Sequence, residues 1–163
     1  MAGIGGAISL KARAIGLLSR REHSRSELQR KLAAHCDDAA ELEQLLGWLE
    51  TGGWLSQERF AESIVHRRAS RHGARRIMHE LRQHELPEDI IADVAENLRA
   101  TELERAQAVW SRRFGSPPAD AREYARQSRY LAARGFSPDC LRRILAGGGF
   151  DPEDDPPPPD EPC

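Results

Sequence analysis

Arginine is the residue type in this sequence that indicates a chemical role most clearly. The stretch from residue 59 to residue 82, RFAESIVHRRASRHGARRIMHELR, contains seven arginines and only two glutamates. Five of these arginines flank a glycine: Arg67, Arg68, Arg71, Arg75 and Arg76. The planar guanidinium group binds phosphate and carboxylate through paired hydrogen bonds. The cluster therefore predicts a basic face for nucleic-acid phosphates or an acidic protein surface, with an ordinary solvated helix face as the alternative.

The histidines suggest metal chemistry at first sight, but their spacing does not support it. His79 and His84 enclose a glutamate in the sequence HELRQH, which is one residue longer than the zinc-binding HExxH motif. Five helical residues rotate the second imidazole by about 140° from the first. We expect structural or solvated histidines and no metal site. The sequence also contains no phosphate-binding glycine loop and no nucleophile motif, so we expect no cofactor, no catalytic residue and no enzymatic activity.

The elements that must position these side chains are helices, because apolar residues recur at helical spacing. One apolar pattern occurs three times, as Leu42, Leu45, Leu46 and Leu49, as Ile91, Val94, Ala95 and Leu98, and as Leu141, Ile144 and Leu145. A period of about 50 residues indicates an array of similar units. The sequence therefore predicts an all-α protein, an elongated array of three tandem three-helix repeats that resemble helix-turn-helix units.

Glycine, proline and capping residues set the boundaries of these units. The predicted segments are a disordered N-terminus (1–7), three three-helix repeats (8–53, 54–100 and 101–149) and a disordered acidic, proline-rich tail (150–163). Ser24 and Glu27 have the spacing of a capping box at a helix start. Trp54 is expected to wedge between the first two repeats. In the third repeat, Gln127 occupies a position where an apolar residue is expected.

Composition and charge limit the class of protein further. Residues 151–163 contain six acidic and no basic residues, so the rest of the chain has 24 basic against 20 acidic residues and a net charge of about +4. The three cysteines, Cys36, Cys140 and Cys163, are far apart, which indicates a reducing compartment. No apolar run approaches the roughly 18 residues that span a bilayer. With no evident dimerisation segment, we expect a cytoplasmic monomer with no membrane association.

An ordered set of motifs resembles the RecX family of regulatory proteins. These motifs are Ser24-Arg25-Ser26-Glu27-Leu28 with Leu32, Gly53-Trp54-Leu55 with Arg59-Phe60-Ala61, and Arg71-His72-Gly73 with Ile77 and Leu81. The resemblance covers about residues 10–147. Ser56-Gln57 departs from the family pattern, which usually has an acidic residue after the Gly-aromatic-Leu motif. Because Ser56 can still cap the following helix, the resemblance holds.

The resemblance implies a modulator of the RecA recombinase. Such a protein would bind RecA and the RecA–single-stranded DNA filament, and would mainly inhibit recombinase, ATPase and coprotease activity, so regulating DNA repair and recombination. Direct contact with DNA would be weak. The residues alone leave an alternative, a direct helix-turn-helix-like DNA-binding protein or transcription factor. Its recognition helix would be Arg75 to Gln83 or Ser24 to Lys31.

Overall fold

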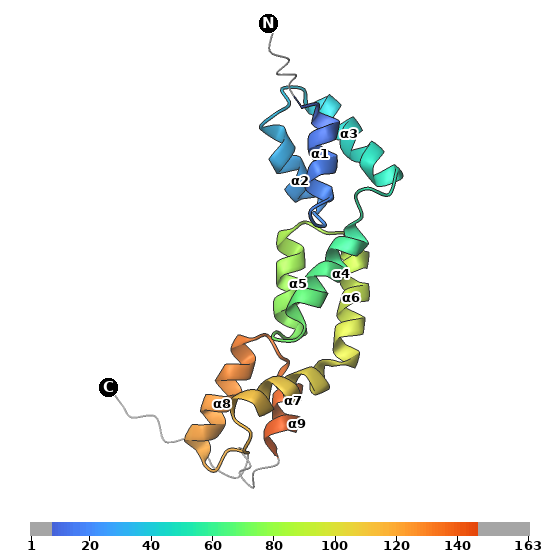
Figure 1. The fold of residues 1–163 in the computed structure, drawn as a ribbon. Helices are drawn as coiled ribbons and strands as arrows, with labels where there is room; N and C mark the ends of the chain where they lie inside the picture. The colour runs from blue at the N-terminus through green and yellow to red at the C-terminus, as the bar shows by residue number, and fades with distance from the viewer. Residues whose placement is uncertain (1–7, 147–163) are drawn as a thin grey trace, which may run out of the picture. The chain divides into compact units, whose positions relative to one another are not determined.

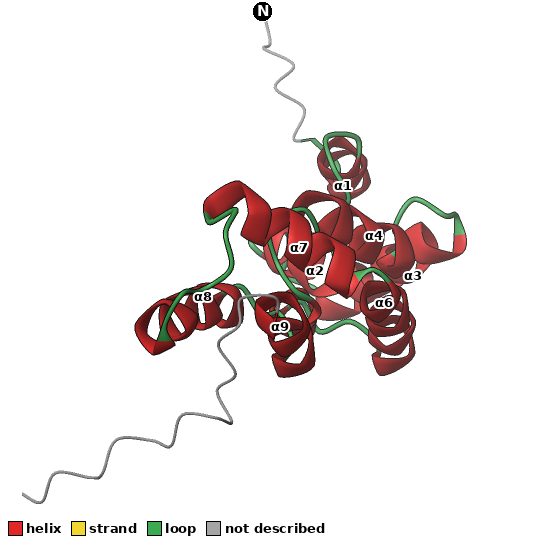
Figure 2. Ribbon diagram, turned by 90° about the horizontal axis from the view of Figure 1, so that it is seen from below, coloured by secondary structure: helices red, strands yellow, loops and turns green. Residues whose placement is uncertain are grey.

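The structure of the protein, a computed structural model, describes residues 8–146. These residues form nine helices and no strand (Figures 1 and 2). The helices are α1 (Leu10–Leu18), α2 (Arg25–Ala33), α3 (Ala39–Thr51), α4 (Gln57–Arg68), α5 (Ala74–Gln83), α6 (Glu88–Ala100), α7 (Glu102–Arg113), α8 (Ala121–Ala133) and α9 (Pro138–Leu145). The predicted all-α class is confirmed. The predicted terminal segments, 1–7 and 150–163, lie outside the described residues.

The described residues form two compact units. The first unit contains residues 8–65 and 80–94, and the second contains residues 66–79 and 95–146. Helices α4, α5 and α6 therefore each contribute residues to both units. The turn that connects α4 to α5, with the arginines around it, belongs to the second unit.

Buried apolar side chains hold each unit together, and several of them lie at positions of the repeated apolar pattern. In the first unit, α1, α2 and α3 enclose a leucine-rich core that includes Leu28, Leu32, Leu46 and Leu49. In the second unit, α7, α8 and α9 enclose a core that includes Val109, Leu131, Phe136, Leu141, Ile144 and Leu145. Burial of each such side chain contributes about 1.5–3 kcal/mol. Trp54, which the sequence predicts as a wedge between the first two repeats, is 47% exposed.

Gln127 is a buried hydrogen-bonding residue of the second unit. Its side-chain oxygen accepts a hydrogen bond of 2.7 Å from Trp110 Nε1, and its Nε2 donates to the carbonyl of Ser116 at 3.3 Å. A buried indole N–H requires such an acceptor, which leucine could not provide. The polar residue at this apolar position is therefore part of the core.

Two backbone segments meet at Gly73 and Gly135 in the second unit. Gly73 N donates to the carbonyl of Arg134 at 2.8 Å, and Arg75 N donates to the carbonyl of Gly135 at 3.2 Å. A Cβ atom on Gly73 would lie 2.3 Å from the carbonyl atoms of Gly135. Gly135 has a φ of +86°, a conformation that favours glycine. This glycine contact fixes the start of α5 against the turn between α8 and α9.

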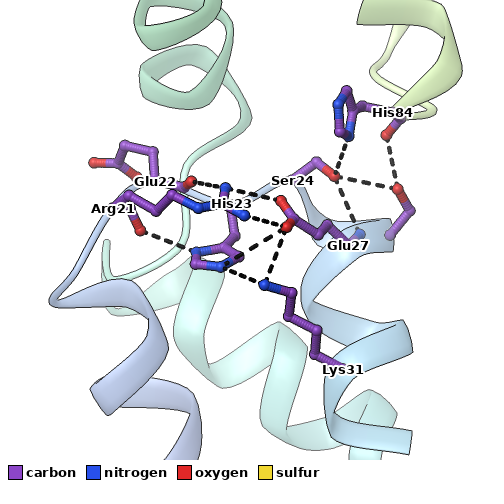
Figure 3. Close-up of polar contacts among 8 residues, drawn as sticks. Arg21, Glu22, His23, Ser24, Glu27, Lys31 and His84 are labelled. Atoms are coloured by element: carbon purple, nitrogen blue, oxygen red, sulfur yellow. Dashed lines mark hydrogen bonds and ion pairs between the residues drawn. The ribbon is translucent and has the colours of Figure 1, made fainter.

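The first unit contains a contact at the equivalent place in the repeat (Figure 3). Ser26 and His84 lie about 50 residues before Arg75 and Arg134, respectively. Ser26 Oγ donates to the carbonyl of His84 at 2.8 Å, so the start of α2 contacts the turn between α5 and α6. Glu85 in that turn has a φ of +57°, and Gly135, at the equivalent position of the second unit, has a φ of +86°. We call this contact between a helix start and a turn the joint of each unit. A serine hydroxyl group forms the joint in the first unit, and backbone hydrogen bonds form it in the second.

A buried histidine lies beside this contact, between α1 and α2 (Figure 3). His23 Nδ1 lies 3.0 Å from the carbonyl of Arg21, and His23 Nε2 lies 3.3 Å from Lys31 Nζ. Because an ammonium group can only donate, Nε2 accepts and Nδ1 carries the proton, so the ring is neutral. Burial lowers the pKa of His23 and outweighs the hydrogen bond to the Arg21 carbonyl, which acts in the opposite direction.

Glu27 is the acidic centre of the same cluster (Figure 3). Its carboxylate pairs with Arg21 and, at 3.2 Å, with Lys31 Nζ. Burial alone would raise the pKa of Glu27, but the hydrogen bonds from Arg21 and Lys31 lower this pKa to about 2. Its backbone N–H donates to Ser24 Oγ at 3.1 Å, which confirms the predicted cap.

The glycine contact predicts a sharp difference between two glycine substitutions. Gly73→Ala should lower the free energy of unfolding by about 3 kcal/mol, because the new methyl group would overlap backbone atoms that cannot move aside. The control is Gly47→Ala in α3, where a Cβ atom meets no atom within 4 Å. That substitution should stabilise the protein by about 0.5–1 kcal/mol through helix propensity. Thermal unfolding followed by circular dichroism measures both, and equal Tm values would contradict the prediction.

The low pKa of Glu27 predicts a specific loss of stability in acid. Glu27→Gln should cost about 2 kcal/mol at neutral pH, because two basic groups lose their partner. Since the folded-state pKa lies below the unfolded value of 4.5, this contribution is complete above about pH 4.5. It should shrink as the pH falls toward 2 and the wild-type carboxylate is protonated. Urea unfolding across this pH range measures the difference, with the exposed Glu96→Gln as control. A difference that does not depend on pH would refute the prediction.

Candidate functional site

The two units carry opposite charge. The described residues of the second unit contain 15 arginines against 6 aspartates and glutamates, a net charge of +9. Those of the first unit contain 9 arginines and lysines against 14 acidic residues, a net charge of −5. The modest charge of the whole chain conceals this separation. A surface of one sign attracts partners of the other sign, so the second unit suits an anionic partner.

The five arginines predicted from the sequence are all exposed and all belong to the second unit. Arg67 and Arg68 lie in the last turn of α4, where basic residues favour the helix dipole. Arg71 lies in the connecting turn. Arg75 and Arg76 lie in the first turn of α5, which contains no acidic residue. A positive charge at a helix N-terminus opposes the dipole, so helix stability does not explain these two residues.

A further arginine, Arg105 on α7, holds the turn that carries Arg71. Its Nη1 donates to the carbonyls of Ala69 at 3.2 Å and His72 at 2.8 Å, and its Nη2 donates to the carbonyl of Leu98 at 2.9 Å. Burial lowers the pKa of Arg105, but a guanidinium group stays protonated in proteins. Because carbonyl groups orient the guanidinium without neutralising it, the turn is fixed and its positive charge is retained.

Two more arginines reach the same region from α7 and from the end of α8. Arg112 donates to the carbonyls of Ala108 at 3.1 Å and Ser70 at 2.9 Å. Arg134 donates to the carbonyl of Tyr130 at 3.3 Å, and its guanidinium carbon lies 3.6 Å from the centre of the Tyr130 ring. The arginine-rich stretch of residues 59–82 did not indicate these two residues, because both lie outside it. A charge count for each repeat would have indicated them.

An activated thiol and a metal site find little support in the described part of the chain. Burial raises the pKa of the Cys140 thiol to about 11, so this thiol is protonated and is not an activated nucleophile. Within residues 8–146, no three His, Cys, Asp or Glu side chains gather in a way that could hold a metal ion. In the same range, no helix is both long enough and apolar enough to cross a membrane.

The fold and the arginine-rich surface define a class of protein, an all-α protein of tandem three-helix domains with one strongly basic unit. The chain belongs to the RecX family. The family models for the first, second and third three-helix domains of RecX match residues 11–49, 56–94 and 100–145, respectively. The predicted fold of three tandem three-helix repeats is thereby confirmed, and the predicted bounds of the repeats stay a prediction.

Relatives described as regulatory protein RecX match nearly the whole chain. The protein from Ralstonia nicotianae is 59% identical over 140 residues, which cover 86% of this chain and 88% of the relative. The protein from Leptothrix cholodnii is 54% identical and covers 85% of this chain and 88% of the relative. The protein from Neisseria meningitidis is 37% identical, with 84% and 89% covered. A regulatory role follows from these similarities.

Solved structures support the same fold. The crystal structure of RecX from Lactobacillus salivarius matches with a TM-score of 0.71 and 18% sequence identity, covering 84% of this chain and 92% of that one. A second crystal structure, of regulatory protein RecX, matches with a TM-score of 0.68 and 21% identity, covering 84% and 73%. At these identities the likeness concerns the fold alone.

The contacts of Arg105 predict that it positions the basic turn. Arg105→Ala should lower the free energy of unfolding by about 2–4 kcal/mol, because several carbonyl groups lose a charged donor. Arg105→Lys keeps the charge but cannot reach all of these carbonyls, so it should recover only part of the loss. The exposed Arg99→Ala is the control and should change stability by less than about 0.5 kcal/mol. Urea unfolding measures the series, and an Arg105→Ala variant as stable as the control would disprove this role.

Proposed function

We propose that this protein is a non-enzymatic regulator that binds RecA and the RecA–single-stranded DNA filament in the cytoplasm. It mainly inhibits the recombinase, ATPase and coprotease activities of RecA, and so regulates DNA repair and recombination. Membership of the RecX family across residues 11–145 is the observation that carries this proposal. The family name gives regulation, and the link to RecA is our inference.

The charge of the second unit supports an anionic partner such as a nucleoprotein filament. Arg71, Arg75 and Arg76 are exposed around the turn between α4 and α5, which the glycine contact and Arg105 hold in place. Prior ordering of the turn reduces the entropy lost on binding. Three tandem domains can also share the contact among several weak sites, which raises the overall affinity. The protein thus combines a fixed basic face with repeated units suited to an extended partner.

A helix-turn-helix transcription factor is the competing function, and the surroundings of α5 disfavour it. Such a protein inserts the N-terminal residues of its recognition helix into the major groove. Here the backbone N–H groups of Gly73 and Arg75 are bonded to the carbonyls of Arg134 and Gly135. The turn between α8 and α9 therefore covers part of the end of α5 that would enter the groove.

The five predicted arginines provide the test of the proposed function. Replacing Arg67, Arg68, Arg71, Arg75 and Arg76 with alanine should weaken inhibition of RecA ATP hydrolysis on single-stranded DNA by tenfold or more. Each lost charge removes a favourable interaction with the anionic filament. The helical circular dichroism signal should stay unchanged, because the five side chains are exposed. The measurement is the concentration of protein that halves the ATPase rate.

A charge-matched variant distinguishes the effect of this basic face on inhibition from the effect of net charge. This variant replaces five exposed arginines of α8 and α9 with alanine and removes as much positive charge as the first variant. The five residues are Arg122, Arg126, Arg129, Arg142 and Arg143. This control should retain most of the inhibition. Equal loss in both variants would assign the effect to net charge, and undiminished inhibition by the first variant would reject the basic face as the contact. If the wild-type protein fails to inhibit RecA, the proposed function itself is wrong.

A further inference from the structure

We propose that a recess in the second unit binds phosphate groups of a nucleic-acid backbone directly, without RecA. The recess has a volume of about 170 Å³, and four arginines line it: Arg71, Arg112, Arg113 and Arg134. Val109 and Tyr130 form the apolar part of its wall. Its residues come from the turn after α4, from α7 and from the end of α8, so folding of the second unit brings them together.

Two of the four guanidinium groups are oriented before any ligand binds. Arg112 is held by two backbone carbonyls, those of Ala108 and Ser70. Arg134 is held by the carbonyl of Tyr130 and by the face of the Tyr130 ring. A guanidinium fixed in this way still has further N–H donors to offer. These two residues therefore present oriented donors to an anion.

The other two arginines, Arg71 and Arg113, also line the recess. The side chains of Arg71 and Arg113 are exposed. Among the residues that the structure describes, none of the four arginines forms an ion pair with a carboxylate. Four like charges around one small space repel each other, and an anion bound there would relieve that repulsion. The recess is therefore electrostatically incomplete without an anionic ligand.

The size of the recess and its surroundings indicate which anion fits. Sites for drug-sized ligands typically measure 300–1,000 Å³, so this recess accepts a small group rather than a whole nucleotide. A phosphate offers several oxygens to several guanidinium forks at once, which suits four converging arginines. Arg67, Arg68, Arg75 and Arg76 extend the basic surface along the neighbouring helices. A ligand with phosphates at regular intervals can use the recess and this surface together.

Binding of nucleic acid without RecA goes beyond the proposed function, and three of the four recess arginines, Arg112, Arg113 and Arg134, lie outside the five arginines tested there. The probe is a fluorescent 20-nucleotide oligothymidylate, compared with a duplex of the same length and with a polyglutamate peptide of similar charge. Fluorescence anisotropy at several salt concentrations gives the affinity and its salt dependence. RecA ATPase inhibition is measured in parallel, so that failure of this inference and failure of the proposed function can be told apart.

Two double substitutions test the recess, and each removes two of its four arginines. The variant R112A/R134A should weaken binding of the oligonucleotide about tenfold or more, and should reduce the slope of log K against log salt by about 1.4 for a single strand. The variant R71A/R113A removes two exposed side chains and should also weaken binding several-fold, so the test stands even if R112A/R134A is unstable. The charge-matched control is R122A/R129A, which removes two exposed arginines of α8 outside the recess and should change the affinity less than twofold.

The affinities of the variants for the three probes decide whether the recess binds phosphate. Selective loss on the single strand, the duplex or both supports a phosphate site and shows which form of backbone it accepts. Wild-type affinity in both recess variants, or a loss no greater than in the control, would overturn the proposal. Polyglutamate that binds as tightly as DNA and responds equally to the substitutions would also overturn it in favour of an acidic protein ligand.

Discussion

The second unit depends on a close backbone contact between Gly73 and Gly135. The two hydrogen bonds across it join the start of α5 to the turn between α8 and α9, and no side chain fits between the two segments. Arg134 precedes Gly135 in that turn, and Arg71 lies two residues before Gly73. The contact that closes the unit therefore also places an arginine on each side of the recess. The geometry of the basic surface follows from a steric requirement of the fold.

The repeat explains why this contact exists, and its variation explains why the two units differ. The first unit builds the equivalent joint from Ser26 and the carbonyl of His84, with a buried neutral histidine and Glu27 nearby. There the positive groups around the joint are matched by a carboxylate. In the second unit, the backbone N–H groups of Gly73 and Arg75 form the equivalent joint, and arginines bonded to carbonyls surround it. One architecture thus carries a charge-balanced joint in one unit and an unbalanced joint in the other.

The sequence predicted the helices, the buried faces and the exposed arginines around Gly73, because apolar spacing and local composition carry that information. It could not predict the contact of Arg105 with Ala69, since the two residues are 36 positions apart and no pattern links them. Gln127 suggested a degenerate repeat because its partner, Trp110, lies 17 positions away on another helix. The recess was missed for the same reason. It joins residues whose spacing is set by packing between helices rather than along one helix.

The way charge is satisfied separates structural arginines from those available to a partner. In the first unit, Arg21, Arg25 and Arg59 each pair with a glutamate, so their charge is largely used within the fold. In the second unit, Arg105 and Arg112 bond to carbonyls, which orient a guanidinium but leave its charge in place. Selection for stability alone would favour acidic partners here, because an excess of like charge destabilises a compact unit. Departures from local optimisation of this kind are expected at functional sites. The uncompensated charge of the second unit is therefore best explained by an anionic partner that completes it.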